Sequence, residues 1–86
     1  MSLWLVEARL RSHLGIDRAR VECIAAGLTP LRPRVLRRRR LHASLHLLAE
    51  GDSGLEATRR ADAALARVLD PFWEIGWETE VVADLG

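Results

Sequence analysis

The stretch from Arg37 to Asp70 constrains the fold most, because a strand pattern, a turn and a helix start follow one another there. In its first part, apolar residues recur at every second position and basic or polar residues fill the places between them. This alternation predicts a strand with one face on a core and the other in solvent. The apolar face comprises Leu41, Ala43, Leu45, Leu47 and Ala49, and the other face comprises Arg38, Arg40, His42, Ser44 and His46.

The turn Glu50-Gly51-Asp52 separates this strand from a predicted helix over residues 55–69. Ser53 and Glu56 have the spacing of a capping box, in which each side chain accepts a hydrogen bond from the backbone of the other residue. The helix stops at Asp70, because the ring of Pro71 disfavours helical geometry in the residue before it. Alternation then returns and predicts a final strand from Trp73 to Ala83. Glu74, Glu78, Glu80 and Asp84 lie on its acidic face.

The first quarter of the chain allows two interpretations. Leu3, Val6, Leu10 and Leu14 are three or four residues apart, which predicts an amphipathic helix over residues 3–14. Trp4, Val6, Ala8 and Leu10 also alternate, so a strand remains the alternative there.

Alternation over residues 18–25 predicts a strand, and the prolines within residues 27–33 predict a loop. The predicted order is therefore α-β-β-α-β. We expect a single domain over residues 1–86, an α+β two-layer sandwich in which a mainly antiparallel sheet is covered by helix.

Composition limits the class of protein further. No apolar run is long enough to cross a bilayer, and no basic segment precedes the first apolar residues, so we expect a soluble chain that is neither membrane-bound nor secreted. Cys23 is the only cysteine, which excludes an internal disulfide, and we expect it to be a small buried side chain.

Charge is distributed unevenly, although the net charge is only +1. The first 45 residues hold ten of the arginines, whereas nine of the carboxylates lie after them. We expect the two groups to form an interface between copies of the chain, and Arg38 and Arg40 can pair with Glu78 and Glu80 either there or within one sheet. The predicted interface residues are Arg37, Arg38, Arg39, Arg40, Glu74, Glu78 and Glu80.

The same basic stretch, from Arg34 to Arg40, supports a second hypothesis, a small nucleic-acid-binding module that neutralises phosphates. Single-stranded nucleic-acid binders usually add aromatic residues for base stacking, and none lies between Trp4 and Phe72. The acidic second half would also repel that ligand, so this hypothesis ranks below protein assembly.

Catalytic and metal-binding patterns are weak. His42 and His46 have the spacing of a helical zinc pair, but on a strand their positions are about 13 Å apart. The carboxylates Glu74, Glu78 and Glu80 have no nucleophile, phosphate loop or paired base beside them in the sequence. We therefore expect no catalytic residues, no cofactor and no metal site, and a protein that is not an enzyme.

The predicted order of elements resembles that of tail terminator and tail-completion proteins of tailed bacteriophages. The segments that carry the resemblance are a helix from Trp4 to Leu14, a pair of strands separated by a loop, the run from Arg39 to Glu50, the helix from Leu55 to Leu69 and a final strand. The resemblance implies a structural virion protein that forms a homo-oligomeric ring at the head–tail junction and contacts other tail or connector proteins. Its location would be the virion and the cytoplasm of the producing cell.

Overall fold

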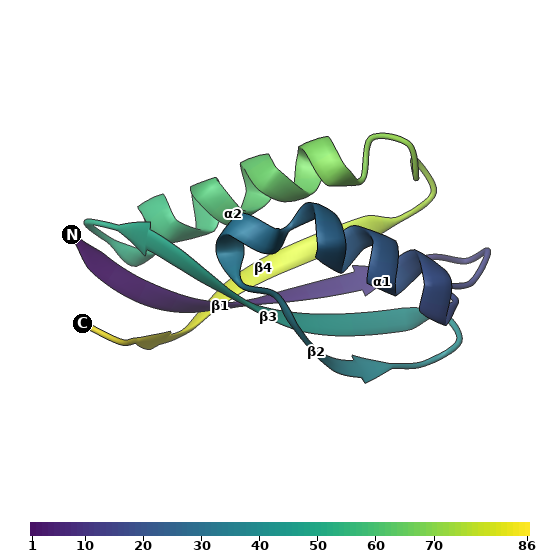
Figure 1. The fold of residues 1–86 in the computed structure, drawn as a ribbon, viewed down its shortest axis with the longest axis horizontal. Helices are drawn as coiled ribbons and strands as arrows, with labels where there is room; N and C mark the ends of the chain where they lie inside the picture. The colour runs from purple at the N-terminus through teal and green to yellow at the C-terminus, as the bar shows by residue number, and fades with distance from the viewer.

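The computed structural model describes residues 1–86, which form a four-stranded sheet and two helices (Figure 1). The strands are β1 (Ser2–Arg11), β2 (Arg34–Arg38), β3 (His42–Gly51) and β4 (Gly76–Asp84). The helices are α1 (Arg18–Gly27) and α2 (Gly54–Val68), and a short 3-10 turn, η1 (Thr29–Leu31), follows α1. Neither helix is long and apolar enough to cross a membrane.

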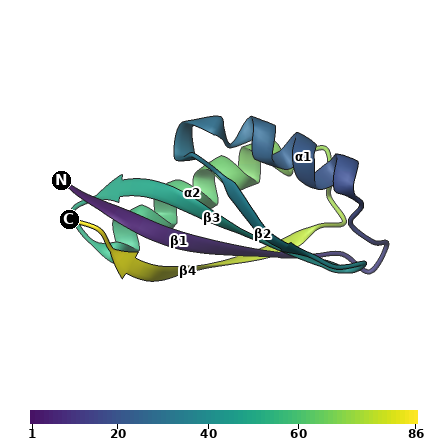
Figure 2. The ribbon, with the colours of Figure 1, turned by 60° about the horizontal axis from the view of Figure 1, so that its bottom comes forward.

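The sheet has the strand order β2-β3-β1-β4, and every neighbouring pair is antiparallel. Both helices lie on one face of this sheet, and the opposite face is uncovered (Figure 2). The β-α-β-β-α-β order with this pairing is the split β-α-β, or ferredoxin-like, topology. The predicted α+β two-layer architecture with an antiparallel sheet is thus confirmed. The predicted order α-β-β-α-β is wrong at its first two elements and lacks β2.

Residues 2–11 form a strand, not the predicted helix. The alternation that favoured a strand is the pattern the structure follows, since Val6, Ala8 and Leu10 are buried on the helix-covered face. β1 occupies the inside of the sheet and pairs with β3 on one side and β4 on the other. Those two ladders satisfy the backbone donors and acceptors of β1 on both sides. This pairing favours the strand over the helix that the spacing of its leucines had suggested.

Residues 18–27 form a helix, not the predicted strand. Asp17 caps it by accepting a hydrogen bond from the Arg20 amide at 2.8 Å. The buried residues are Val21, Ile24 and Leu28, which have the spacing of one helical face. Cys23 is exposed on the other side of this helix, contrary to the expectation that it would be buried.

The strand–turn–helix prediction is confirmed in most respects. Leu45 and Leu47 are fully buried on β3, and Ser53 accepts a hydrogen bond from the Glu56 amide at 3.2 Å to start α2. Glu56 reaches back to the amide of Asp52 instead of that of Ser53. Arg38 lies outside β3, because it belongs to β2 and pairs with Ala43 across a turn.

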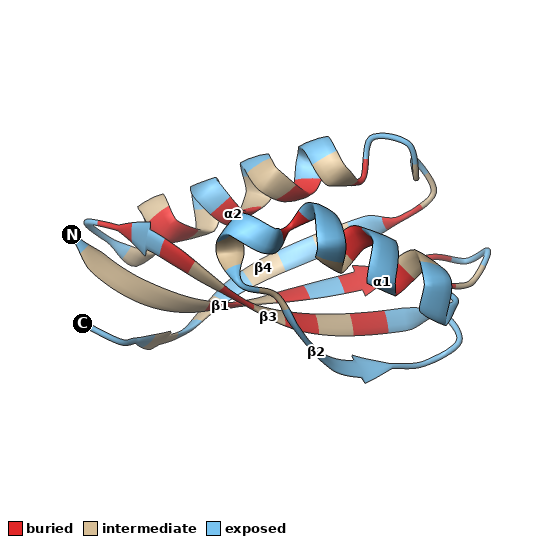
Figure 3. Cartoon of the chain, viewed as in Figure 1, coloured by how far each residue is buried: buried red, intermediate tan, exposed pale blue.

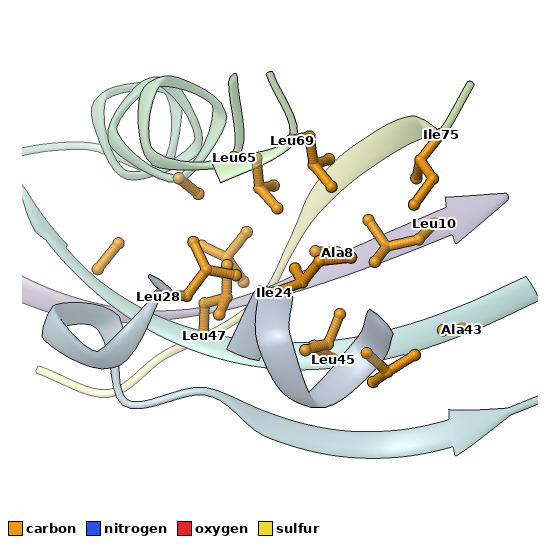
Figure 4. Packing of buried hydrophobic residues seen from close by; sticks show 14 of the residues in the cluster. Ala8, Leu10, Ile24, Leu28, Ala43, Leu45, Leu47, Leu65, Leu69 and Ile75 are labelled. Atoms are coloured by element: carbon orange, nitrogen blue, oxygen red, sulfur yellow. The ribbon is translucent and has the colours of Figure 1, made fainter. Parts of the chain in front are cut away.

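The core lies between the sheet and the helices as one cluster of 16 buried residues. Leu45 from β3, Leu65 from α2 and Ile24 from α1 point into it together (Figure 4). The two chain termini lie side by side at one end of the sheet, where the amide of Leu3 donates to the carbonyl of Gly86 at 3.3 Å and that of Leu85 donates to Leu3 at 2.8 Å (Figure 1).

Candidate interaction surface on the open sheet

The uncovered face of the sheet, called the open face below, carries the side chains that alternate with the core residues. On β1 these are Leu3, Leu5, Glu7, Arg9 and Arg11, since Val6, Ala8 and Leu10 point to the helices. The strand register arranges the side chains of this face in rows across the sheet. One row is Arg34, His46, Glu7 and Glu80, the next is Arg37, Ser44, Arg9 and Glu78, and a third is Leu48, Leu5 and Ala83.

Arg9 is the centre of the charged part of this face. Its guanidinium lies 3.0 Å from Glu80, 3.2 Å from Glu7 and 3.6 Å from Glu78. The hydrogen bond with Glu80 raises the pKa of Arg9; desolvation opposes this increase, and the charges of Glu80, Glu7 and Glu78 add to it. Arg11 adds a longer contact of 3.9 Å to Glu78.

Strand β2, at one edge of the sheet, differs from the rest of this face because its charges are not neutralised. All five of its residues are exposed (Figure 3). Its arginines and those of the following turn form no ion pair within the chain. Arg38 makes one weak hydrogen bond, to the carbonyl of Ile16 at 3.4 Å. We call Arg34, Arg37, Arg38, Arg39 and Arg40 the basic edge.

The predicted interface residues fall in different places. Arg37 points to the open face, Arg38 lies on the helix side of β2, and Arg39 and Arg40 form the β2–β3 turn. Because β2 and β4 are the two outer strands, the arginines of the basic edge do not meet Glu78 and Glu80 within one molecule. The prediction that they can face each other within one sheet is wrong. Within the molecule, Arg9 contacts Glu78 and Glu80, and Arg11 contacts Glu78.

Glu74 lies apart from Glu78 and Glu80, although the sequence pattern placed all three on one face. It belongs to the connection between α2 and β4, and its side chain is only 7 % exposed. It pairs with Arg20 of α1, and that guanidinium also lies over the Phe72 ring at 5.7 Å. Glu74 thus ties α1 to the end of the sheet inside the molecule.

The aromatic residues do not contribute to the open face. Trp4 lies on the helix side, where its indole donates to the carbonyl of Gly51 at 3.0 Å. Trp77 is also there and donates to Asp62 of α2 at 3.3 Å. Trp73 is 81 % exposed but precedes β4, in the connection from α2. The open face therefore offers charge and leucines, with no surface for base stacking.

The histidines of β3 lie on the open face, as the alternation predicted. His46 is half-buried, with its Nε2 atom 3.7 Å from Glu7, and His42 is exposed near Arg11. The structure brings together no group of three or more histidine, cysteine or carboxylate side chains that could hold a metal ion.

Sequence reasoning missed Glu7, Arg9 and Arg11 as members of this surface, because it placed them on a helix. Their alternation with Val6, Ala8 and Leu10 was the available signal. Comparisons with protein-family models, with curated proteins and with solved structures find no match to this chain. A common topology does not determine a function, so the charges and exposed side chains of the sheet are the features that indicate one.

Proposed function

We propose that this chain is a structural, non-enzymatic protein that assembles with copies of itself, with the basic edge of one copy meeting the acidic edge of the next. The observation that carries the proposal is the opposite charge of the two sheet edges. β2 carries Arg34 and Arg37 on the open face, while β4 carries Glu80 and Glu78 there. Only the arginines lack a partner within the molecule.

The positions along the strands support the same contact. Arg34 and Glu80 belong to one row of the sheet, and Arg37 and Glu78 belong to the next. A neighbouring copy placed beside the first, with its sheet continuing the same plane, brings each arginine next to a carboxylate. β2 and β4 run in opposite directions, so this arrangement is antiparallel at the joint, like every pair inside the sheet.

Side chains, not a continuous ladder of backbone hydrogen bonds, would make this joint. Each edge strand contains an extra residue, Leu36 in β2 and Val82 in β4, where the register shifts. Bulges of this kind protect sheet edges against uncontrolled pairing. Guanidinium–carboxylate contacts between side chains can form across the joint even though the bulges interrupt backbone pairing. The strength of these contacts falls as the salt concentration rises.

A contact between two different patches closes into a ring when the rotation between copies is right, and otherwise continues as a filament. We place the ring in the setting that the resemblance to tail terminators suggests, at the end of a phage tail beside connector proteins. The part of the resemblance that remains is the segment from Arg39 onward, because the N-terminal segment is a strand.

Charge reversal tests the contact directly. The variant Arg34→Glu/Arg37→Glu makes both edges acidic, and Glu78→Arg/Glu80→Arg makes both basic. We expect each variant alone to be monomeric by light scattering at low salt, and the mixture to recover the parent assembly. Arg59→Glu/Arg67→Glu, on exposed positions of α2 without ion pairs, is the matched control and should assemble normally.

Circular dichroism must show that each variant is folded, since Glu78→Arg/Glu80→Arg also removes partners of Arg9. A parent chain that stays monomeric at high concentration and low salt contradicts the proposal, and so does a mixture that stays monomeric. Negative-stain microscopy of the assembly distinguishes rings from filaments, and only rings fit the setting at a phage tail.

The unpaired arginines of the basic edge favour one second candidate, a nucleic-acid-binding module. Glu7, Glu78 and Glu80 on the same face, and the absence of aromatics there, rank it lower. Titration with single- and double-stranded DNA and RNA at low and moderate salt tests it. Binding that weakens steeply with salt and is lost in Arg34→Glu/Arg37→Glu would favour this candidate, whereas no binding at low salt removes it.

A further inference from the structure

The open face has a second unusual property, an apolar end beside its charged rows. Leu5, Leu48 and Ala83 form one row there, and Leu3 lies in the next. Leu85, which is 51 % exposed, hydrogen-bonds through its backbone to Leu3 at the same end. No helix covers these side chains, because α1 and α2 both pack on the other face (Figure 2).

The two charged rows carry opposite charges at their ends, Arg34 and Glu80 in one row and Arg37 and Glu78 in the next. In the row that begins with Arg34, the charge changes from basic on β2 to acidic Glu7 and Glu80 on β1 and β4. A surface with this pattern is complementary to itself when it is turned over about an axis parallel to the strands. That rotation places β2 over β4 and β3 over β1, and it keeps each row opposite itself.

We infer that two copies of the chain stack their open faces against each other about such a two-fold axis. This inference rests on the proposed self-association and specifies a second contact within it. In this arrangement Arg34 lies over Glu80 of the second copy, and His46 lies over its Glu7. The row of Leu5, Leu48 and Ala83 lies over the same row of the other copy, so the apolar ends cover each other.

The dimensions of the face are sufficient for a stable pair. Three strands of nine or ten residues and one of five, at spacings of about 4.8 Å between strands and about 3.3 Å along them, give a projected area of about 550 Å². The two faces together give about 1,100 Å², which is just below the standard range for specific interfaces and above the minimum of about 1,000 Å² expected of a biological one. Stacked sheets cross at about 30°, which keeps the middle of the two faces in contact and separates their corners.

The alternative two-fold axis, perpendicular to the strands, does not give a complementary pair. It places β2 over β2 and β4 over β4, so basic strands meet basic strands. It also places the apolar end over the opposite, charged end of the sheet, around Arg11 and His42. The charge pattern therefore selects a single orientation.

Leu48→Arg tests the inference, with Leu55→Arg as the matched control. Leu48 lies in the apolar row of the open face, whereas Leu55 is 61 % exposed in the first turn of α2. We expect Leu48→Arg to raise the dimer dissociation constant at least tenfold in sedimentation equilibrium, and Leu55→Arg to leave it unchanged. Circular dichroism melts confirm folding.

Crosslinking keeps the test valid if Leu48→Arg does not fold. In a Cys23→Ser background, Leu48→Cys should give covalent dimers with a bismaleimide whose span is about 10 Å, the spacing of stacked sheets. Leu55→Cys is the control and should not crosslink. Each chain then carries a single cysteine, so the crosslinked product is a dimer, and its yield reports how often two Leu48→Cys positions lie within reach of each other.

The Leu48 variants separate this inference from the proposed function, whereas charge reversal changes both contacts because Arg34 and Glu80 belong to each. Assembly that depends on the edge charges but is unaffected by Leu48→Arg, with no Leu48→Cys dimer, overturns the stacking and leaves the edge contact intact. Loss of dimers in Leu48→Arg together with a Leu48→Cys crosslink supports the stacking. A parent chain that is monomeric in every condition contradicts both.

Discussion

The two faces of the sheet use the same strands for opposite purposes. On the helix-covered face, Val6, Leu45 and Leu47 have no solvent exposure, and their packing with α1 and α2 holds the fold together. On the open face, the neighbouring positions hold Glu7, Arg9 and Glu80 in ion pairs that solvent screens. The difference indicates that stability resides on one face, which leaves the composition of the other free to serve contacts with other molecules.

The largest effect is expected on the covered face. Leu45→Ala or Leu65→Ala should lower the free energy of unfolding by about 2 to 5 kcal/mol, through lost apolar burial and a residual cavity. That approaches the whole stability of a domain of this size, about 5 to 8 kcal/mol. Circular dichroism melts should therefore show a largely unfolded or aggregating chain. A Leu45→Ala protein that melts within a degree or two of the parent would contradict the assigned core.

A smaller effect is expected at Asp62, the polar contact between α2 and β4. Its carboxylate accepts from the Thr79 hydroxyl at 2.8 Å and from the Trp77 indole at 3.3 Å. Asp62→Ala should cost about 1 to 2 kcal/mol in urea unfolding, because both donors lose their acceptor. Asp70→Ala, at an exposed carboxylate without an ion-pair partner, is the control. Equal costs for the two variants would show that this contact does not stabilise the covered face.

Arg9→Ala should change stability less than Asp62→Ala, although it removes three ion pairs at once. The Arg9 side chain is 47 % exposed, so solvent screens these contacts. The expected loss should be present at low salt and vanish at high salt. A large loss that persists in high salt would mean that the open face also holds the fold together.

The smallest effect on folding is expected at the basic edge. Arg38→Ala should leave the free energy of unfolding within about 0.5 kcal/mol of the parent value, since Arg38 is exposed and makes one weak hydrogen bond. Light scattering of the same variant should show weaker assembly at low salt. Unchanged assembly would limit the joint to Arg34 and Arg37, on the open side of β2.

The two halves of the chain differ in how far their sequence determined the prediction. β3, α2 and β4 were predictable, because a clean alternation, the Ser53 cap and Pro71 all indicate the same elements. β1 carries leucines on both faces, at Leu3 and Leu5 and at Leu10, so helical and strand spacings coexist. Only the pairing with β3 and β4 resolves that ambiguity, and pairing between distant strands cannot be read from a local pattern.

The charged surface was predictable only in part, because local patterns can be read from the sequence but the order of strands in the sheet cannot. The basic edge and the acidic residues of β4 followed from local patterns, but the strand order that separates them did not. α1 is short and rich in alanine, and its alternation of small residues imitated a strand. The buried residues Val21, Ile24 and Leu28, together with the Asp17 cap, were the signals that favoured a helix.

The adjacent chain ends have a practical consequence for engineering. Leu3 and Leu85 are joined by backbone hydrogen bonds, so a few flexible residues can connect the last residue of the chain to the first without disturbing the sheet. New termini could then be opened at the exposed Arg39–Arg40 turn, because loop tips tolerate such cuts. Affinity tags fused to the new termini of this circular permutant would lie beside the basic edge, away from the apolar end of the open face.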